Sequence, residues 1–188
     1  MRDSMASNEV RIIGGNWRGR KIVFPDRQDL RPTLGRVRET LLNWLRADVP
    51  GSRCLDLFAG SGALGFEAAS RGAAAVTLVE SDRRVARCLR ENAARLDAHN
   101  VTVVCEPAER LLRRRGGPWD IIFVDPPFQQ HVLVAVLDAI AATQALAPDG
   151  LLYVEAPRRE VLSGARWRQV KHGRAGDTQF GLLALATP

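Results

Sequence analysis

Residues 55–65 read L-D-L-F-A-G-S-G-A-L-G, and this stretch decides the fold of the chain. A short apolar run leads into Gly60, Gly62 and Gly65, which together spell G-x-G-x-x-G, and a helical pattern follows them. Glycines at these places let the backbone turn sharply between a strand and a helix and approach a ligand closely. Glu80 ends the next apolar run, where a carboxylate can accept hydrogen bonds from both hydroxyls of a ribose. The pattern predicts a cofactor that contains a nucleoside.

A second carboxylate, Asp56, narrows the choice of cofactor. It lies inside the predicted strand, before Gly60, where a dinucleotide site usually has an apolar residue. A negative charge beside the loop disfavours a pyrophosphate and suits a cationic ligand. S-adenosylmethionine carries an ammonium and a sulfonium and no phosphate, so it is the cofactor that the stretch favours. NAD(P) and a purely structural turn stay open as alternatives.

From residue 53 onward, short apolar runs alternate with longer helical segments. This alternation is typical of βαβ units, in which a parallel sheet carries helices on both faces. Residues 164–178 show no helical pattern before the final apolar run, so we expect an antiparallel hairpin to close the sheet. The predicted fold class is therefore α/β, Rossmann-like, with a mostly parallel sheet. The apolar runs comprise residues 53–58, 75–80, 101–106, 120–125, 151–156 and 180–186.

The fourth apolar run ends in D-P-P-F, residues 125–128. Asp125 precedes a proline, which biases it away from helical backbone angles, and Pro126 and Pro127 have a fixed φ and no N–H donor. Such a rigid bend holds the Asp125 carboxylate and the Pro126 carbonyl as acceptors for the two N–H bonds of an amine, while Phe128 can stack on a base. We expect methyl transfer to an exocyclic base amine here. A simple break between strand and loop is the structural alternative.

The N-terminal part of the chain differs from the rest in charge. Residues 10–38 hold eight basic and two acidic residues, a net +6 that equals the net charge of the whole chain. Residues 10–24 are expected to form two short strands around a glycine-rich turn, and a helix is expected from about Leu34 until Pro50 stops it. A basic segment beside a neutral body suggests a nucleic acid partner, although charged runs are often only solvated surface. The candidate RNA-binding residues are Arg11, Trp17, Arg18, Arg20, Lys21, Arg31, Arg36 and Arg38.

These motifs resemble those of a known family. D-P-P-F is similar to the (Asp or Asn)-Pro-Pro-aromatic motif of amino-methyltransferases. Together with R-I-I-G-G-N-W-R-G-R-K at 11–21 and L-R-P-T-L-G-R-V-R-E-T at 30–40, the stretch 55–65 resembles the RsmD family, and the likeness covers most of the chain. It implies a class I methyltransferase domain at 51–188 behind an RNA-binding arm at 1–50, with S-adenosylmethionine as the methyl donor. The implied target is the N2 amine of a guanine in 16S ribosomal RNA, within an assembled or assembling 30S particle.

The resemblance also implies roles for single residues. By this likeness, Asp56, Gly60 and Gly62 would line the methionine end of the cofactor. Glu80 would bind its ribose, and Ala108 would lie beside its adenine. One departure is Pro107, because such enzymes often carry Asp or Asn there to contact the adenine amino group. The implied cofactor-binding residues are Asp56, Ala59, Gly60, Gly62, Glu80, Ala108 and Asp125, and the implied catalytic residues are Asp125, Pro126, Pro127 and Phe128.

Composition disfavours other classes of protein. The chain has no run of about 20 apolar residues and no apolar segment near its start, so we expect neither a membrane span nor secretion. The cysteines are far apart and the histidines lack ligand spacing, so we expect no metal. We expect a cytoplasmic monomer. The alternatives are a DNA or other RNA amino-methyltransferase acting on adenine N6, a catalytically silent nucleic-acid-binding protein of the same fold, and a dehydrogenase.

Overall fold

The computed structural model describes residues 7–26, 33–114, 117–126, 132–159 and 166–186. Strands and helices alternate along most of the chain. The strands are β1 (Ser7–Arg11), β2 (Lys21–Pro25), β3 (Arg53–Asp56), β4 (Ala75–Val79), β5 (Val101–Val104), β6 (Trp119–Val124), β7 (Leu146–Pro157), β8 (Trp167–Ala175) and β9 (Thr178–Leu185). The helices are α1 (Gly35–Trp44), α2 (Ala63–Ser70), α3 (Arg83–Leu96), α4 (Ala108–Arg113) and α5 (Leu133–Thr143).

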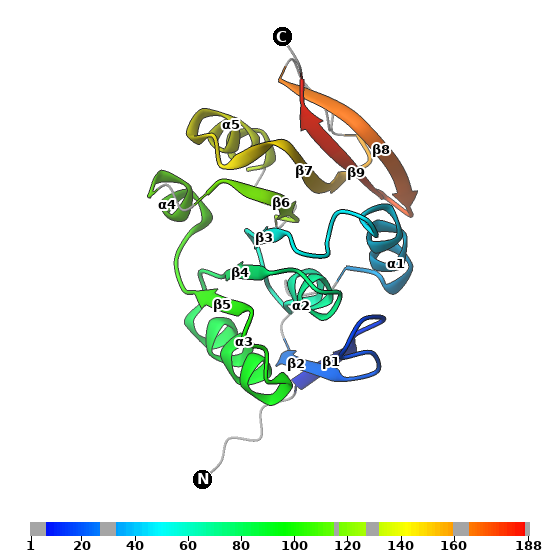
Figure 1. Cartoon of the computed structure of the whole chain (residues 1–188), viewed down its shortest axis with the longest axis vertical. Helices are drawn as coiled ribbons and strands as arrows, with labels where there is room; N and C mark the ends of the chain where they lie inside the picture. The colour runs from blue at the N-terminus through cyan, green and yellow to red at the C-terminus, as the bar shows by residue number, and fades with distance from the viewer. Residues whose placement is uncertain (1–6, 27–32, 115–116, 127–131, 160–165, 187–188) are drawn as a thin grey trace.

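Seven strands form one twisted sheet in the order β5-β4-β3-β6-β7-β9-β8 (Figure 1). The first five strands of that order are parallel, with β3 in their middle. The chain adds β4 and β5 on one side of β3 and then returns to add β6 and β7 on the other. In such sheets a ligand binds beyond the carboxyl ends of the strands, where the order of the strands reverses. The predicted α/β fold is confirmed, and the functional site is expected beyond β3, β4 and β6.

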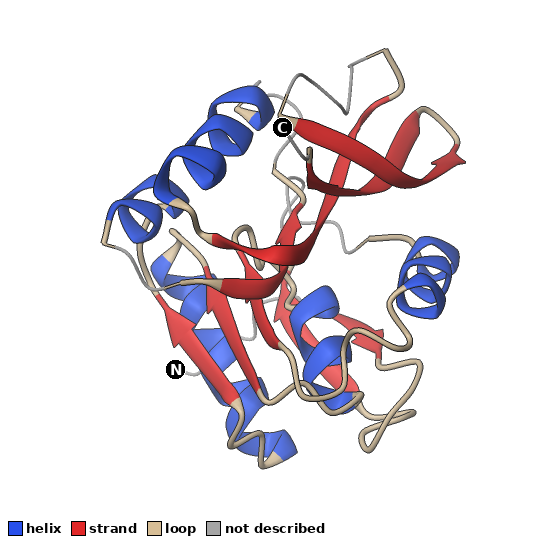
Figure 2. Cartoon of the chain, turned by 45° about the horizontal axis from the view of Figure 1, so that its top comes forward, coloured by secondary structure: helices blue, strands red, loops and turns tan. Residues whose placement is uncertain are grey.

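Helices cover both faces of the sheet (Figure 2). One hydrophobic core lies between the sheet and helices α1, α2 and α3, and it includes Leu41, Phe66 and Leu89. The second lies between the sheet and helices α4 and α5, and it includes Leu112 and Ile140. The strands between them are apolar on both faces, which is the pattern expected of a parallel sheet buried on both sides.

The first two strands form a separate antiparallel hairpin, in which Ser7 pairs with Pro25 and Arg11 with Lys21. This agrees with the strands and turn expected from the sequence. Helix α1 is shorter than the apolar pattern suggests, because it ends at Trp44 and tight turns carry the chain on to Gly51. Apolar residues of the hairpin and of α1 lie in the same core as those of α2 and the sheet. The N-terminal arm therefore packs as an integral part of the fold.

The chain closes the sheet with the antiparallel strands β7, β9 and β8. The expected hairpin is confirmed: β8 pairs with β9 from Trp167 opposite Leu185 to Ala175 opposite Thr178. β9 lies against the long strand β7, so β8 is left as an edge strand of the sheet. Helix α1 packs beside this hairpin, where the ring of Trp44 stacks on Phe180 with centroids 5.4 Å apart.

Candidate cofactor and amine sites

The glycine loop follows β3, and the side chain of Asp56 bonds to its backbone. Its carboxylate, at the carboxyl end of β3, accepts a hydrogen bond from the backbone N–H of Gly65 at 3.1 Å and another from that of Phe58. Gly62 has φ 81°, a left-handed conformation that glycine adopts without strain. A Cβ on Gly65 would come within 2.1 Å of Leu78, so helix α2 approaches the sheet closely only because this residue is glycine.

Burial shapes the electrostatics of this loop. The Asp56 side chain is removed from solvent, which raises its pKa to about 7, while the two backbone N–H groups oppose the shift and the charge of Glu80 adds to it. The carboxylate form is the one that holds the loop, because only it accepts both hydrogen bonds without giving up an acceptor oxygen. The Asp56 carboxyl thus joins the carboxyl end of β3 to the loop and to the first turn of α2.

Glu80, immediately after β4, lies beside the same loop. One carboxylate oxygen accepts the N–H of Gly60 at 3.1 Å, and the other accepts the N–H of Asp82 at 2.8 Å. The first oxygen keeps a further acceptor position, and the second also accepts a long hydrogen bond of 3.5 Å from the Ser81 hydroxyl, which a ribose hydroxyl could replace. Asp82 in turn caps helix α3 by accepting the N–H groups of Arg84 and Val85. Glu80 is thus fixed in place and still partly exposed.

The remaining residues expected to hold the cofactor lie at the same end of the sheet. Ala59 begins the turn after β3, and its N–H donates to the carbonyl of Val79. Ala108 is the first residue of α4, directly after Pro107, and it is buried. The partly exposed Glu80 carboxylate suits a ribose, and the glycine loop with its small neighbours leaves room for a cationic tail. These residues fit S-adenosylmethionine, which supplies an electrophilic methyl group on its sulfonium.

Asp125 directly follows β6, the strand next to β3. One of its carboxylate oxygens accepts a hydrogen bond from the hydroxyl of Thr33 at 3.2 Å. Asp125 is partly exposed and Pro126 is buried, whereas Pro127 and Phe128 lie outside the described residues. Removal from bulk water raises the pKa of Asp125 well above its ordinary value; the charges of Glu155 and Asp56 raise it further, and the Thr33 hydroxyl opposes them.

A neighbouring carboxyl, Glu155, completes this cluster, and the sequence analysis does not identify it. It lies on β7 and accepts the hydroxyl of Tyr153 at 2.6 Å. Thr33 hydrogen-bonds to Glu155 as well as to Asp125. A hydroxyl has a single proton, so it can bridge two carboxyls only when one of them is protonated and donates to it. Burial raises the pKa of Glu155, and the hydrogen bonds from Tyr153 and Thr33 oppose that shift.

A signal for Glu155 is present in the sequence. The apolar run L-L-Y-V-E-A, residues 151–156, has an acidic residue near its end. The runs that contain Asp56 and Asp125 also have an acidic residue near their ends. A lone carboxylate that ends a buried strand points to the ligand-binding edge of a parallel sheet. Thr33 has no comparable signal, because only the packing of the arm places it over Asp125.

The candidate RNA-binding residues of the arm are spread over several surroundings. Arg11, Arg18 and Arg36 are exposed, and Trp17 packs partly buried against the core. The guanidinium of Arg20 donates to the carbonyl of Arg95 at 2.8 Å, and the ammonium of Lys21 pairs with Glu9 at 2.5 Å. Arg31 lies outside the described residues.

Arg38 requires a correction. The sequence predicts an RNA contact, but the structure buries this side chain to 4% exposure. Its guanidinium donates to the carbonyl of Arg11 at 3.1 Å and pairs with Glu67 at 3.2 Å. A buried guanidinium with an internal carboxylate partner is not available to phosphates. Charge counting misplaces Arg38 because the sequence does not reveal that its partner lies on α2.

Glu67 is the centre of the contact between the arm and α2. Its carboxylate accepts the N–H of Ile13 at 2.5 Å and that of Gly14 at 3.3 Å, and it pairs with Arg38 and Arg71. Burial raises the pKa of Glu67 and lowers that of Arg38, although each charge favours the other. This group holds the arm, and it lies apart from the cofactor loop.

Two other kinds of site are absent from the described residues. No helix among them is long and apolar enough to cross a membrane. No group of three or more His, Cys, Asp or Glu side chains in the same part of the chain is arranged to hold a metal ion.

The fold and these sites define a class I methyltransferase that depends on S-adenosylmethionine. An S-adenosylmethionine-dependent methyltransferase from Agrobacterium tumefaciens shares this fold with a TM-score of 0.63 at 20% identity, over 85% of this chain and 56% of that one. A solved Escherichia coli structure described as a methyltransferase, yhhF, matches with a TM-score of 0.87 and 43% identity, over 96% of this chain and 100% of that one.

The particular family follows from the sequence comparisons. The model of the family described as Conserved hypothetical protein 95 matches residues 10–184. Ribosomal RNA small subunit methyltransferase D of Escherichia coli strain K12 is 46% identical over 181 residues, which cover 94% of this chain and 90% of that relative. The chain belongs to this family, the RsmD family.

Proposed function

We propose that the protein transfers a methyl group from S-adenosylmethionine to the N2 amine of a guanine in the 16S RNA of the small ribosomal subunit. The observation that carries the proposal is the position of Asp125 and Pro126, at the carboxyl end of β6 and next to the strand that ends in the glycine loop. The name of the Escherichia coli relative supports ribosomal RNA as the substrate. The cytoplasm, where ribosomal subunits assemble, is the proposed location.

The described residues suggest how the amine is activated. The lone pair of an exocyclic amine is delocalised into the base, so the nitrogen is a poor nucleophile until its N–H bonds are held. In the proposed complex the Asp125 carboxylate accepts one N–H bond and the Pro126 carbonyl accepts the other. Both acceptors are fixed before the base arrives, which reduces the reorganisation that the reaction needs. As positive charge grows on the nitrogen, Asp125 stabilises it and takes the proton at its carboxylate.

The neighbouring carboxyl serves the same step. With a proton shared through Thr33, Asp125 and Glu155 carry one charge fewer than two free carboxylates. When the amine becomes cationic, it favours the ionised form of Asp125, because a nearby positive charge stabilises a carboxylate. Glu155, which is bonded to Tyr153, then keeps the shared proton, so the Asp125 oxygen that faces the base stays free to take the proton that the amine loses. Asp56 and Glu80 hold the cofactor and take no part in the proton transfer.

A methylation assay tests the proposal. The protein is incubated with S-adenosylmethionine labelled in its methyl group and with small ribosomal subunits, naked 16S RNA or duplex DNA. We expect the label in N2-methylguanosine from ribosomal RNA. Label in N6-methyladenine would replace guanine by adenine as the target, and label in DNA would replace the RNA substrate. Cofactor binding without transfer to any substrate would favour the catalytically silent alternative.

A further inference from the structure

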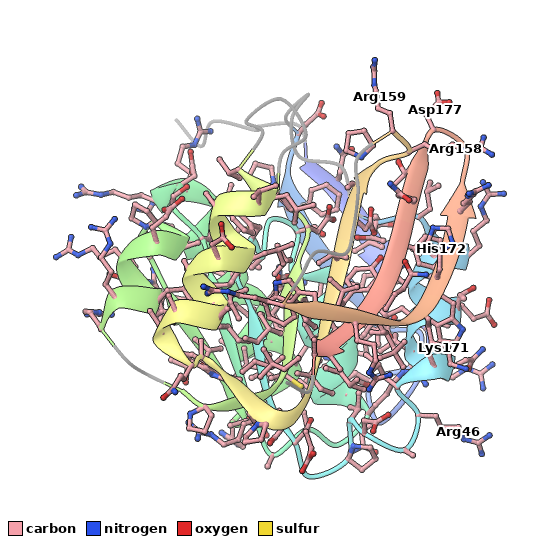
Figure 3. All side chains as sticks on the ribbon, turned by 90° about the horizontal axis from the view of Figure 1, so that it is seen from above. Arg46, Arg158, Arg159, Lys171, His172 and Asp177 are labelled. Atoms are coloured by element: carbon pink, nitrogen blue, oxygen red, sulfur yellow. The ribbon has the colours of Figure 1, made fainter. Side chains whose placement is uncertain are left out.

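A second basic surface lies at the edge of the sheet formed by β8. Residues 157–177 contain six basic and two acidic residues, although the sequence analysis places all of the net charge in the arm. We use the name outer edge for β8 together with Arg158 and Arg159. Figure 3 shows Arg158, Arg159 and Lys171 along one side of the molecule. The exposed basic residues of the outer edge are Arg158, Arg159, Arg168, Lys171 and Arg174.

Three cations of the outer edge lack a carboxylate partner within the described part of the chain. Among the residues that the structure describes, Arg158, Lys171 and Arg174 form no ion pair with a carboxylate. Of the strands that the structure describes, β8 pairs with β9 alone, so the N–H and C=O groups on its other side have no described strand to bond. A row of unpaired cations beside unpaired backbone donors is complementary to phosphate.

The outer edge reaches the end of the sheet that carries the amine site. Val154 of β7 is the register partner of Val124, so Glu155 is level with Asp125. Arg158 lies three residues beyond Glu155, about 10 Å at the rise of a strand, and its N–H donates to the carbonyl of Asp177 in the β8–β9 turn.

Lys171 also shares a face of the sheet with this site. It is the register partner of Leu182, and Leu182 is in turn the partner of Tyr153 on β7. Directly opposed residues of antiparallel strands project to the same side. Lys171 therefore lies on the side of the sheet that carries the hydroxyl bonded to Glu155.

The basic tip of the first hairpin lies at the other end of the molecule. We use the name hairpin tip for residues 14–21. The N–H of Asn16 donates to the carbonyl of Ser70, and the Ser70 hydroxyl donates to the carbonyl of Gly14. Ser70 ends α2, which begins at Ala63 beside the glycine loop, and a helix of eight residues is about 12 Å long. The hairpin tip is thus a full helix length away from the cofactor loop, and Arg20 and Lys21 have partners within the protein.

We infer that the outer edge grips the phosphates of the RNA strand that presents the target base. The inference rests on the proposed function, because it assumes an RNA substrate. It assigns the electrostatic contact nearest the amine to β8, Arg158 and Arg159, and not to the hairpin tip. Cations on an edge strand also prevent strands of two molecules from pairing, so the rival explanation is protection from aggregation alone.

Three double charge reversals with equal charge change separate these explanations. The edge variant carries Arg158→Glu and Lys171→Glu, and the tip variant carries Arg18→Glu and Lys21→Glu. The control carries Arg87→Glu and Arg113→Glu on α3 and α4, which lie away from β8 and which no role has been given. Binding to naked 16S RNA is measured at several salt concentrations, and methyl transfer to small subunits is measured at one. Cofactor affinity and the thermal midpoint verify that each variant is folded.

The edge variant is expected to lose on the order of tenfold in RNA affinity at moderate salt, with a log–log salt slope flatter by about 0.7 for each lost phosphate contact. Its cofactor affinity stays that of the wild type, as does the slope of the control. A wild-type slope in the edge variant overturns the inference, whether or not the protein then self-associates, and so does a flatter slope only in the tip variant. If the wild type methylates no RNA, the proposed function itself falls, and the slopes still decide where RNA binds.

Discussion

Two groups of carboxyls that are largely removed from water have opposite surroundings in this protein. Glu67 on α2 is surrounded by two guanidinium groups and two backbone N–H donors. Asp125 and Glu155 are surrounded by the hydroxyls of Thr33 and Tyr153, and no described cation pairs with either. Burial raises the pKa of all three carboxyls.

The difference would separate a structural carboxyl from one that serves the proposed methyl transfer. The negative charge of Glu67 is satisfied inside the protein, so it joins the arm to α2 and has nothing left to offer a ligand. Asp125 and Glu155 are held in place by hydroxyls that do not neutralise their negative charge, so a nearby cation would stabilise them. A base amine that becomes positive during methylation would supply that cation.

Removing the structural carboxyl is expected to cost the most. Glu67→Ala leaves Arg38 buried without a partner and the N–H groups of Ile13 and Gly14 without an acceptor. Breaking a buried ion pair on one side costs about 3–5 kcal/mol of unfolding free energy. Urea unfolding measures the loss, and Glu67→Gln, which keeps an acceptor oxygen, should lose less. A loss below about 1 kcal/mol in both variants would mean that Glu67 does not anchor the arm.

Removing the functional carboxyl is expected to leave the fold intact and stop the reaction. Asp125→Ala removes one acceptor of the amine, and losing such a preorganised partner costs about 3 kcal/mol, or roughly a hundredfold in rate. The unfolding free energy of this variant should equal or exceed that of the wild type. The substitution removes a carboxyl that is kept from water without a cationic partner, which is a cost to the folded state. Single-turnover methyl transfer and urea unfolding are measured together, with Asp125→Asn as the milder control. Wild-type turnover in Asp125→Ala would remove this residue from the amine site.

The pH dependence of stability should differ in sign from that of an ordinary acidic residue. The folded-state pKa of Glu155 lies above its unfolded value, so the stabilisation that this group contributes is complete below the unfolded pKa of about 4.3. It is lost as the pH rises through the folded-state pKa. Glu155→Gln removes this loss, so the variant should gain unfolding free energy relative to the wild type as the pH rises. A difference independent of pH, measured by urea unfolding from pH 4 to pH 8, would contradict the shared-proton arrangement.

The smallest effect is expected from the arm residue that reaches the amine site. Thr33→Val keeps the shape of the side chain and removes the hydroxyl that bonds Asp125, a loss of about 1 kcal/mol. Because this hydroxyl lowers the pKa of Asp125, its removal should move the acidic limb of the pH–rate profile to higher pH. A merely structural Thr33 would change stability and leave that limb in place, so the profile decides between the two roles.

Much of the fold is predictable from local patterns. Each parallel strand appears as a short apolar run. In the helices between them, apolar residues recur three or four positions apart. The missing helix before the last run correctly indicates the closing hairpin. The end of α1 is less predictable, because the apolar pattern continues through Leu45 and Val49 in turns that follow the helix.

The site is predictable where its chemistry is carried by neighbours in sequence. Asp56 with the glycine loop, Glu80 at the next strand end, and Asp125 before two prolines form patterns that the chemistry itself requires. Because carboxyl ends of adjacent parallel strands meet at one edge, the sequence also determines that these groups lie at the same end of the sheet.

Only the tertiary structure decides which charges are available. Arg38 and Arg36 look equivalent in the sequence, yet one is buried against Glu67 and the other is exposed. The arm carries the net charge of the chain, but its hairpin tip is bonded to the far end of α2, while Arg158 and Lys171 of the outer edge are exposed and have no carboxylate partner among the described residues. Charge adds along a chain without regard to position, whereas binding depends on which charges remain unpaired and where the fold brings them together.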